Sequence, residues 1–355
     1  MNRESKPIRG RGVSRNLPNR FETIVRVPDP DYTDPDGESL NLRTLFLKDT
    51  TRSIVTFNES PDVGFDVSVN PYRGCEHGCA YCYARPYHEY LGFSSGLDFE
   101  TKVLVKERAA ELLRAKLSSP RWTPRPVALS GVTDPYQPVE KHLRITRGCV
   151  EALAEFRNPV TIVTKNHLIT RDADLLSSLA RVSAALVMIS FSTLNTELSH
   201  LLEPRTSTPS RRLQAIRALS EAGIPVGAFV APVIPGLTDH EVPSIVESVA
   251  QAGAGFALCH LVRLPHGVAT LFEEWLDSHL PDRKNKVLSR IRDTRRGRLD
   301  DSRFCTRTRG EGKFADQIMK LFEVACRRAG IACEGPDLST GAFRRPSKGQ
   351  PSLFD

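Results

Sequence analysis

Three cysteines, Cys75, Cys79 and Cys82, lie within eight residues of the sequence RGCEHGCAYCY, which covers positions 73–83. In a reducing compartment, clustered cysteines are more often metal ligands or catalytic groups than disulfides. Closed structural zinc sites have four ligands, and iron–sulfur clusters generally take four cysteines. The C-x3-C-x2-C spacing therefore predicts a metal centre whose set of sulfur ligands is one short.

Two interpretations of this incomplete set remain open from the residues alone. Gly74 and Gly78 allow the backbone to turn tightly enough for three thiolates to converge on one centre. A cluster held by three thiolates would leave one iron open to bind and activate a small molecule. Alternatively, His77 or His88 would complete a zinc site.

The elements that must position these cysteines are predicted from hydrophobic runs. Six short apolar runs suited to buried strands recur along the chain, with helical patterns between them. The runs cover residues 64–69, 125–131, 159–165, 183–192, 224–233 and 255–262. Strict alternation of strands and helices predicts a parallel sheet with helices outside, because parallel neighbours need crossover connections.

Helix starts are readable between these runs. Small polar residues cap helices, proline is favoured at the first helical position, and Thr with Glu three residues later forms a capping box. The expected start signals are Thr146, Asp172, Thr208 followed by Pro209, and the capping-box pair Thr238 and Glu241.

The alternation predicts an α/β fold, a partial (β/α)6 barrel of the TIM type, with a doubly wound open sheet as the competing architecture. No G-x-G-x-x-G motif opens the first helix, which argues against a dinucleotide-binding fold. Active sites of barrels lie at the carboxyl ends of the strands. The three cysteines follow the first apolar run, so we expect them at that end.

The positive charge of the chain is regional. The formal net charge is +7, and residues 283–313 contain twelve basic side chains against four acidic ones. Clustered Lys and Arg suit a polyanion such as nucleic acid, although a solvated basic helix has the same composition. We expect a basic, partly disordered arm (1–55), the barrel (56–280), a basic helical extension (281–345) and a flexible tail (346–355).

The N-terminal sequence MNRESKPIRGRG has no apolar segment of the kind found in signal peptides. No apolar run approaches the roughly 18 to 20 residues of a membrane span. We therefore expect a cytoplasmic protein without a membrane association.

The cysteine motif, with Tyr81 as the aromatic residue before the third cysteine, resembles the signature of the radical S-adenosylmethionine (SAM) superfamily. Further segments resemble its spore photoproduct lyase-like, or DNA repair photolyase-like, branch. They are NPYRGCEHGCAYCYARP, TDPYQPVE, TKN, EPRTSTPSRRLQAIRALSEAGIPV and APVIPGLTD, in this order. The resemblance covers roughly residues 50 to 345 and implies the same partial barrel.

The resemblance implies a [4Fe-4S] cluster on Cys75, Cys79 and Cys82, with SAM bound to the fourth iron. It implies reductive cleavage of SAM to a 5′-deoxyadenosyl radical, which abstracts a hydrogen atom from a substrate. The cofactor would carry the difficult chemistry, while the protein binds, orients and excludes water. A flavodoxin or ferredoxin is the implied reducing partner.

The resemblance also assigns residues around SAM. Tyr81 would pack beside the adenine, and Thr133 with Asp134 would contact the SAM amine. A plain turn is the alternative for Thr133 and Asp134, since Thr-Asp-Pro commonly starts turns. Lys165 would face the SAM carboxylate, or would be an exposed lysine at a strand end.

Four later residues complete this predicted pocket. Ser190 and Ser192 would reach the ribose hydroxyls, although serines at a strand end also allow close packing. Glu203 and Arg205 in LEPRT would form an ion pair that lines the cofactor pocket, or an external salt bridge.

Spore photoproduct lyase carries a cysteine beside its second strand as a hydrogen donor, whereas the corresponding segment RPVALSGVTD has none. This difference argues against direct reversal of a thymine photoproduct. Tyr136 or a distant cysteine is a speculative alternative donor. Cys149 and Cys259 are expected as buried apolar residues.

Cys305, Cys326 and Cys333 raise the hypothesis of a second cluster, but their long gaps match no tight ligand pattern.

The last six residues, QPSLFD, resemble the bacterial sliding-clamp-binding peptide. Gln350 precedes the pair Leu353 and Phe354, which would enter an apolar pocket, and Pro351 replaces the leucine common in that peptide. A short anchor of this type is a known mode of recognition. A frayed terminus is the alternative.

The sequence thus predicts a radical SAM enzyme that acts on DNA or another nucleic-acid-associated substrate. One alternative is a non-catalytic, metal- or cluster-containing protein associated with DNA or the clamp. Another is a radical SAM enzyme that acts on a protein or a small metabolite. The substrate, the product, the abstracted hydrogen and the fate of SAM do not follow from the sequence.

Overall fold

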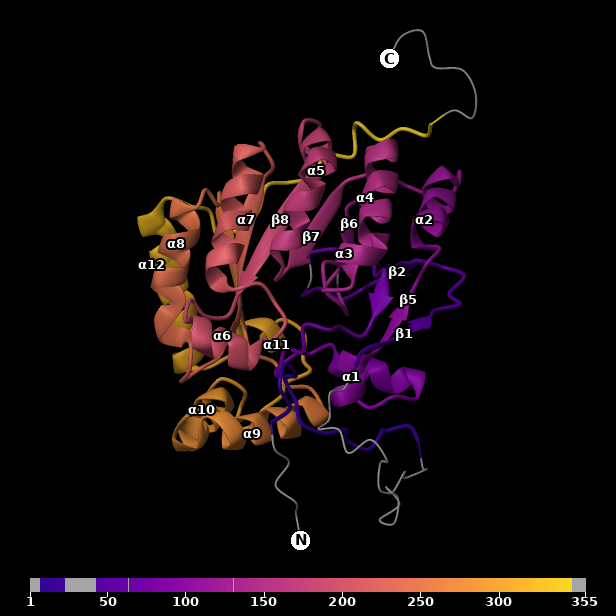
Figure 1. The fold of residues 1–355 in the computed structure, drawn as a ribbon. Coiled ribbons are helices and arrows are strands. Elements are labelled where there is room, and N and C mark those ends of the chain that lie inside the picture. Colours follow the sequence, from indigo (N-terminus) through magenta and orange to yellow (C-terminus); the bar gives the residue numbers. More distant parts are fainter. Residues whose placement is uncertain (1–6, 23–42, 63, 130, 347–355) are drawn as a thin grey trace.

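A seven-stranded sheet forms the centre of the molecule in the computed structural model, which describes residues 7–22, 43–62, 64–129 and 131–346 (Figure 1). The strand order is β10-β9-β8-β7-β6-β3-β2, and every pairing is parallel except that of β2 with β3. The strands are β2 (Val55–Phe57), β3 (Val67–Val69), β6 (Val127–Leu129), β7 (Val160–Thr164), β8 (Ala185–Phe191), β9 (Val226–Val233) and β10 (Phe256–Leu261).

The six predicted runs are the six parallel strands, so the (β/α)6 prediction is confirmed. These strands follow one another across the sheet in chain order, without the reversal that defines a doubly wound sheet. The competing architecture is therefore excluded. The edge strands β2 and β10 do not pair with each other among the described residues, so the barrel is partial.

Helices cover the outer face of the sheet and bury its apolar side chains in the main hydrophobic core. They are α2 (Ala109–Ser118), α4 (Ile145–Phe156), α5 (Ala173–Ala180), α7 (Pro209–Glu221), α8 (Val242–Gln251) and α12 (Lys313–Ala329). The start of α7 is as predicted, because the Thr208 hydroxyl accepts a hydrogen bond from the N–H of Arg211 and Pro209 is the first helical residue.

The predicted start at Asp172 is confirmed, because Asp172 is the N-cap residue of α5, although its side chain makes no capping hydrogen bond. The other two predicted starts need correction. Thr146 lies inside α4, whose N-cap is Arg144, because its hydroxyl donates to the Pro135 carbonyl instead. The capping box is wrong: the Glu241 carboxylate accepts from Thr193 and Leu194, and a short 3-10 helix, η3 (Asp239–Glu241), precedes α8.

A second, small sheet has the order β1-β5-β4 and supports the cysteine segment. Its strands are β1 (Leu45–Lys48), β4 (Tyr72–Arg73) and β5 (Lys102–Val105), with η1 (Arg85–Leu91) and α1 (Leu97–Thr101) between the last two. Strand β1 lies within residues 1–55, where the sequence predicted a basic, partly disordered arm, so part of this region is regular. The small sheet fixes where the cysteine segment begins.

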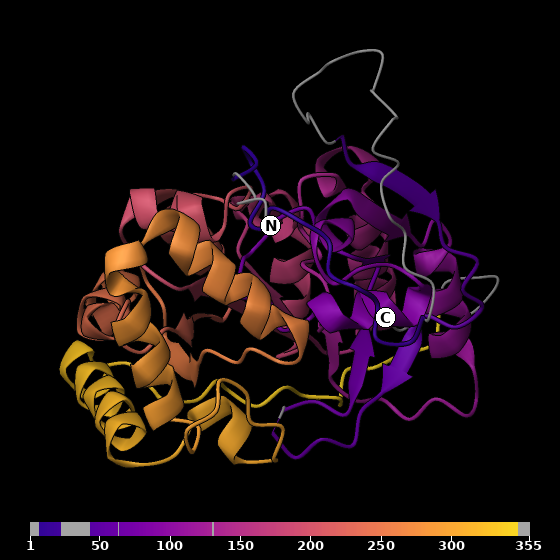
Figure 2. The same ribbon diagram turned by 90° about the horizontal axis from the view of Figure 1, so that it is seen from below.

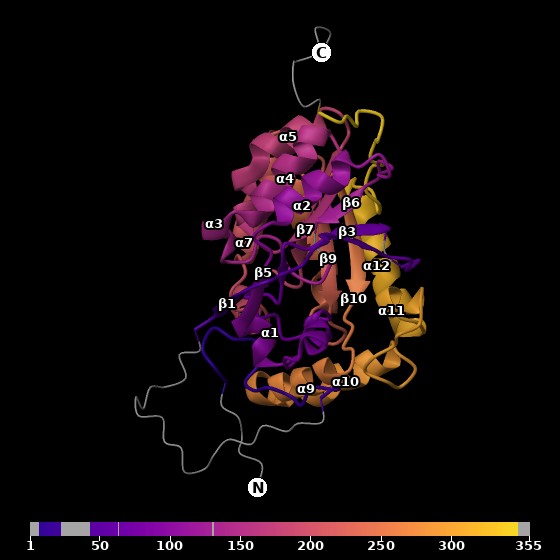
Figure 3. The same ribbon diagram turned by 90° about the vertical axis from the view of Figure 1, so that its right-hand side faces the viewer.

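The carboxyl ends of the barrel strands face α1, α9 (Gly267–His279) and α10 (Pro281–Asp293), which lie together at one end of the molecule in Figures 1 and 3. Three short helices, α3 (Glu140–Leu143), η2 (His167–Asp172) and α6 (Thr196–Leu202), follow strands directly or through short loops. Figure 2 shows this end face on. The cysteine segment lies there, because the N–H of Cys75 donates to Phe99 of α1 and the N–H of Ala80 donates to Leu202 of α6.

The C-terminal extension is helical only in part, with α10, α11 (Thr306–Arg309) and α12. Residues 331–346 then cross the opposite end of the barrel, at the amino ends of the strands (Figure 1). Ala332 bridges to Phe256, the N–H of Ser339 donates to Ser183, and that of Arg344 donates to Phe156. The predicted clamp peptide lies beyond, outside the described residues. No helix of the described residues is both long and apolar enough to cross a membrane.

The N-terminal segment, residues 7–22, lies against the end that holds the cysteines. The N–H of Gly12 donates to a Glu100 carboxylate oxygen at 3.1 Å, and Arg15 forms an ion pair with Glu274 of α9. A Cβ atom added at Gly12 would lie 1.6 Å from the backbone oxygen of Gly78. The segment is therefore fitted to the cysteine segment at backbone level.

Replacing Gly12 with alanine should detach residues 7–22, because the backbone of Gly78 cannot make room for the methyl group. We expect a loss of about 1–3 kcal/mol of unfolding free energy, typical of overpacking. Amide hydrogen exchange over residues 8–20 should become faster. Gly255→Ala is the control, since its added Cβ meets no atom within 4 Å. Equal exchange in both variants would contradict the fit.

Candidate metal centre

The cysteine segment, Gly74–Ala84, runs from β4 to η1 and contains Cys75, Cys79 and Cys82. Gly74 and Gly78 have φ of +81° and +67°, in the left-handed region that favours glycine. The N–H of Cys75 donates to Phe99 at 2.9 Å, and that of Cys82 donates to Cys79 at 3.2 Å. The predicted glycine turns are thus present, and they fold the three thiols into one short loop.

A buried ion pair behind the segment holds its backbone in place. Arg85 and Glu100 are both fully buried, and Arg85 Nη2 lies 2.5 Å from Glu100 Oε1. Arg85 also donates two hydrogen bonds to the Cys79 carbonyl, at 2.8 and 3.1 Å. Sequence reasoning missed both residues, because charged residues usually lie at the surface.

The three thiols lie in a poorly solvated environment. Burial raises the pKa of Cys75, Cys79 and Cys82, while the Lys165 ammonium lowers the pKa of Cys79 and Cys82. Metal ligands must be thiolates, so binding of a metal centre here would release protons. Lys165 favours the deprotonated form that a metal needs.

The two histidines proposed for a zinc site already have other partners. His77 Nδ1 lies 3.3 Å from an Asp134 oxygen, and its Nε2 lies 3.3 Å from the amide nitrogen of Asn166. His88 Nε2 lies 3.0 Å from the Lys102 carbonyl. Within the described ranges, no three His, Cys, Asp or Glu side chains are grouped as ligands of a single ion. The three thiols are part of this result and do not meet at a single ion either. A cluster does not require that, because each thiolate binds a different iron, and three thiols on one loop leave one iron open.

Glu203 organises the predicted cofactor residues at the ends of β7 and β8. Its carboxylate accepts hydrogen bonds from Tyr81 and from Ser192, the latter at 2.7 Å. The same carboxylate pairs with the Lys165 ammonium at 3.2 Å and with the buried Arg212 guanidinium. The structure therefore brings four of the predicted residues together around one buried charge.

The charge on Glu203 is strongly stabilised. Burial opposes ionisation, but Arg212 and Lys165 outweigh it and hold the pKa of Glu203 well below its ordinary value. The Lys165 ammonium also donates to the Ala231 carbonyl at 3.0 Å and lies 5.8 Å from the centre of the Tyr81 ring. The side chains of Tyr81, Lys165 and Ser192 are thus held in fixed positions.

The predicted pair of Glu203 and Arg205 does not form. Arg205 instead pairs with Glu76 at 3.1 Å and donates to Thr44, and its side chain is one-third exposed. Arg212 takes the place beside Glu203, one helical turn into α7. The signal for Arg212 was its position on the sheet-facing side of a helix, where an apolar residue is usual.

Thr133 and Asp134 form the turn that was the alternative to cofactor binding. Asp134 accepts hydrogen bonds from the Thr164 hydroxyl at 2.7 Å and from the N–H groups of Lys165 and Tyr136 at 2.8 and 2.9 Å. Thr133 donates to the Gly74 carbonyl at 2.7 Å. The turn thus ties the end of β6 to β7 and to the cysteine segment.

Ser190 is buried, and its carbonyl accepts from Arg212 at 3.0 Å. Tyr136, the speculative hydrogen donor, is fully buried and donates to Asp172 at 3.1 Å. Asp172 also pairs with Arg147 and Arg171. Tyr136 therefore belongs to a buried polar network beside the core, which accounts for it without a role as donor.

The other cysteines do not form a second group with Cys305. Cys149 and Cys259 are buried in the core, as expected. Cys326 is buried and interacts with Cys333. Cys305 lies on a loop, and its own backbone N–H donates to an Asp62 carboxylate oxygen. No three of these thiols gather as ligands of a single ion in the described residues.

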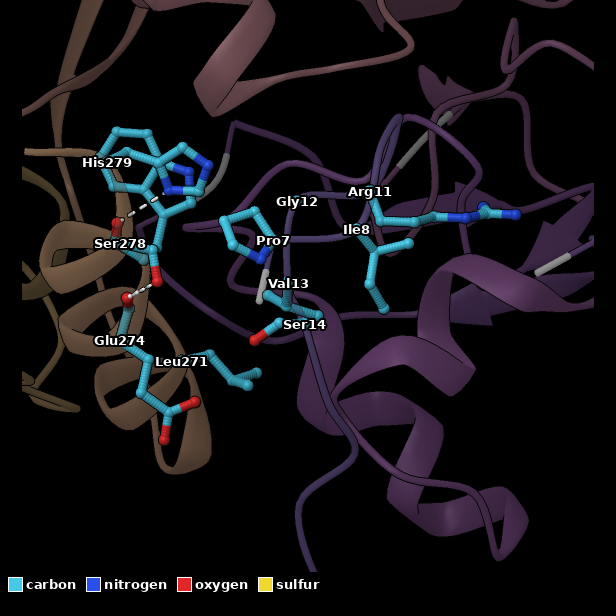
Figure 4. A pocket seen from close by; sticks show the side chains of 11 residues that line it. Pro7, Ile8, Arg11, Gly12, Val13, Ser14, Leu271, Glu274, Ser278 and His279 are labelled. Carbon is cyan, nitrogen blue, oxygen red and sulfur yellow. Dashed lines mark hydrogen bonds between the residues drawn. The ribbon is translucent and has the colours of Figure 1, made fainter. Parts of the chain in front are cut away.

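A small crevice separates the N-terminal segment from α9 (Figure 4). Ile8, Val13, Leu271 and Ser278 are among the residues that line it, and its volume is about 10 Å³. This volume suits about one water molecule. The crevice is therefore too small for a nucleoside-sized cofactor.

The chain resembles known proteins both in sequence and in fold. Residues 69–249 match the sequence model of the radical SAM superfamily. An uncharacterized protein of Mycobacterium tuberculosis is 39% identical over 236 residues, which cover 66% of this chain and 68% of that protein. A radical SAM Nα-GlyT isomerase of Pseudomonas phage M6 is 26% identical over 226 residues, 63% of this chain and 45% of that protein.

Among solved structures, spore photoproduct lyase with bound AdoMet and dinucleoside spore photoproduct matches with a TM-score of 0.58. The two sequences are 14% identical, and the match covers 81% of each chain. At this identity the likeness concerns the fold.

Proposed function

The chain belongs to the radical SAM superfamily of enzymes, and from this premise we propose that it acts on DNA or another nucleic-acid-associated substrate. The observation that carries the proposal is the set of three thiols on one glycine-turned loop, with both nearby histidines bonded elsewhere. The chain thus offers three thiolate ligands, and the fourth iron of the cluster would stay open for SAM.

Cys75, Cys79 and Cys82 would hold a [4Fe-4S] cluster, and Arg85 and Glu100 would keep their loop rigid. When bound, the cluster and SAM supply a 5′-deoxyadenosyl radical for hydrogen abstraction. The residues of this chain then have only to bind, orient and exclude water.

The residues around Glu203 would form one wall of the SAM site. Glu203 holds Tyr81, Lys165 and Ser192 in fixed positions, so that Tyr81 can pack beside the adenine and Lys165 can face the carboxylate. Ser190, at the end of β8, and Thr133 with Asp134, in the turn after β6, would be supporting residues. Arg205 lies nearer the surface, paired with Glu76.

Two observations support a nucleic-acid substrate. Spore photoproduct lyase, whose fold this chain shares, binds a dinucleoside spore photoproduct. In the basic stretch 283–313, six of the twelve cationic side chains form no ion pair within the described residues; they are Arg283, Lys286, Arg295, Arg298, Arg309 and Lys313. Unpaired cations are those that remain for phosphate groups.

We also propose two protein partners. A flavodoxin or ferredoxin would supply the electron that radical SAM enzymes need. The tail residues Gln350, Leu353 and Phe354 would bind the sliding clamp and bring the enzyme to DNA; the support is the likeness of QPSLFD to the clamp-binding peptide.

Anaerobic reconstitution with iron and sulfide, followed by dithionite and SAM, tests the proposal. We expect 5′-deoxyadenosine, detected by mass spectrometry, and a faster rate with duplex or single-stranded DNA than with protein or no addition. A fully loaded, reduced cluster that yields no 5′-deoxyadenosine would favour the non-catalytic alternative. Formation that is indifferent to DNA and RNA would move the substrate to a protein or small metabolite.

A further inference from the structure

Three buried polar atoms gather just beyond the end of β10 without hydrogen-bond partners. The described residues contain five such side-chain atoms, and three of them are Arg263 Nε, Arg295 Nε and Asp300 Oδ1. Arg263 Nε lies 3.6 Å from Asp300 Oδ1, beyond hydrogen-bonding distance. Arg263 Nε and Asp300 Oδ1 face each other as an ion pair, so Arg295 Nε is the atom of this cluster that no group of the described residues satisfies.

Arg295 is almost fully buried, and its position is fixed by backbone carbonyls. Its Nη atoms donate to Val262 at 2.6 Å and to Thr306 at 3.1 Å, which leaves Nε unbonded. Burial lowers the pKa of Arg295 to about 10, Asp300 raises it, and Arg263 lowers it. Two guanidinium groups are therefore held within electrostatic range of each other.

The carboxylates around this place do not balance its cations. Asp301 is bound by Arg303 and Asp62 by Arg307, so these acids are already neutralised.

Asp300 alone then faces Arg263 and Arg295. Arg309 adds a third cation, which interacts with His260 of β10 and has no ion pair in the part of the chain that the structure describes. The surplus of about two positive charges in a partly buried place favours an anion. We name Arg263, Arg295, Arg309 and Asp300 the β10 arginine corner.

The corner lies beside the cysteine segment. Tyr83 directly follows Cys82, donates its hydroxyl to Gly131 at 2.6 Å and interacts with both Arg263 and Arg307. Lys165 and Ser192, which are proposed for SAM, directly follow other strands, β7 and β8. Because all these groups are at the carboxyl ends of strands, the corner is on the substrate side of the same site.

We propose that the β10 arginine corner is an anion site that binds a phosphate group of the substrate. The inference rests on the proposed function, in which that substrate is a nucleic acid or one of its components. The partly exposed Arg263 guanidinium donates to the phosphate oxygens, while the buried Arg295 behind it and the exposed Arg309 contribute charge. Guanidinium groups suit this task because their planar donors match phosphate oxygens.

Calorimetric titration of the reconstituted full chain with thymidine, thymidine 5′-monophosphate and the dinucleoside monophosphate TpT tests the site. We expect either phosphate to tighten binding by about tenfold over thymidine, a common size for one charged contact. Arg263→Gln should remove most of this gain. Arg309→Gln, an exposed position that cannot disturb packing, should remove part of it.

Arg298→Gln is the matched control, because Arg298 is an exposed arginine of the same stretch outside the corner. Arg263→Lys should restore part of the gain. A larger gain for TpT than for the monophosphate identifies the phosphodiester of a strand, and the reverse identifies a free nucleotide. No gain from phosphate in the unaltered protein, or equal losses in Arg263→Gln and Arg298→Gln, would overturn the proposal.

Formation of 5′-deoxyadenosine, measured on the same samples, separates this inference from the proposed function. Its absence with a retained phosphate gain would refute the chemistry and leave the anion site in place. Its presence without a phosphate gain would refute the anion site alone.

Discussion

Alanine at Cys75, Cys79 or Cys82 should abolish binding of the cluster and reduce 5′-deoxyadenosine formation to the level of a protein-free control. Each thiol is one of only three candidate sulfur ligands on the segment, and neither His77 nor His88 is free to replace it. Iron and sulfide analysis of the reconstituted variants, with absorption spectra before and after SAM, would measure the loss.

Two exposed cysteines provide the controls. Cys305→Ala and Cys333→Ala change thiols far along the chain from the cysteine segment, so both variants should keep the cluster. His77→Gln should also keep it, whereas a zinc site completed by His77 would lose metal. A SAM-responsive cluster that survives in Cys79→Ala would show that the ligand assignment is wrong.

Glu203→Gln should lower the free energy of unfolding by about 3–5 kcal/mol, the usual result of breaking a buried ion pair on one side. The variant leaves the fully buried Arg212 guanidinium without its carboxylate and weakens the hold on Lys165. Urea unfolding monitored by circular dichroism at pH 7 would measure the change.

Glu197→Gln is the matched control, because Glu197 is exposed on the neighbouring helix α6. The double variant Glu203→Gln, Arg212→Gln should recover part of the loss, as the uncompensated charge is gone. A loss of unfolding free energy below about 1 kcal/mol in Glu203→Gln would show that the buried pair of Glu203 and Arg212 does not stabilise the fold in this way.

The unfolding free energy of Glu203→Gln should depend less on pH in acid than that of the unaltered protein. The pKa of Glu203 is depressed in the folded protein, so its ionisation contributes stability above about pH 4.5 that is lost as the pH falls below that value. The unaltered protein should therefore lose stability more steeply in this range. The difference in urea midpoint between it and Glu203→Gln should narrow as the pH falls.

Periodicity was sufficient to predict the barrel. The six apolar runs consist largely of Val, Ile, Leu and Ala, a pattern typical of parallel strands. Strands β3, β6 and β8 are buried along their whole length, and β7, β9 and β10 contain buried and half-buried residues but no exposed ones. The strand order follows from short right-handed crossovers between sequential neighbours. The glycine turns around the cysteines were also predictable, because Gly74 and Gly78 adopt the positive φ that glycine allows.

The buried ionic contacts were not predictable from local sequence. Arg85, Glu100 and Arg212 are charged residues whose partners lie elsewhere in the fold, and in a sequence they look like residues of a solvated surface. The wrong capping box has the same origin: Glu241 reaches back to Thr193 and Leu194 because β8 and β9 are adjacent in the sheet. The buried polar atoms without hydrogen-bond partners beyond β10 could not be predicted from the sequence either, because their surroundings form only in the folded chain.

The contact of the N-terminal segment with α9 has a consequence for the order of events during synthesis. Arg15 and its partner Glu274 are separated by 259 residues. At roughly 5–20 residues per second on the ribosome, α9 emerges about 13–50 s after the segment that it anchors. For most of this interval the nascent chain carries all three thiols without the anchored segment beside them, so an iron–sulfur donor that acts while translation continues meets a more accessible loop than the finished protein offers.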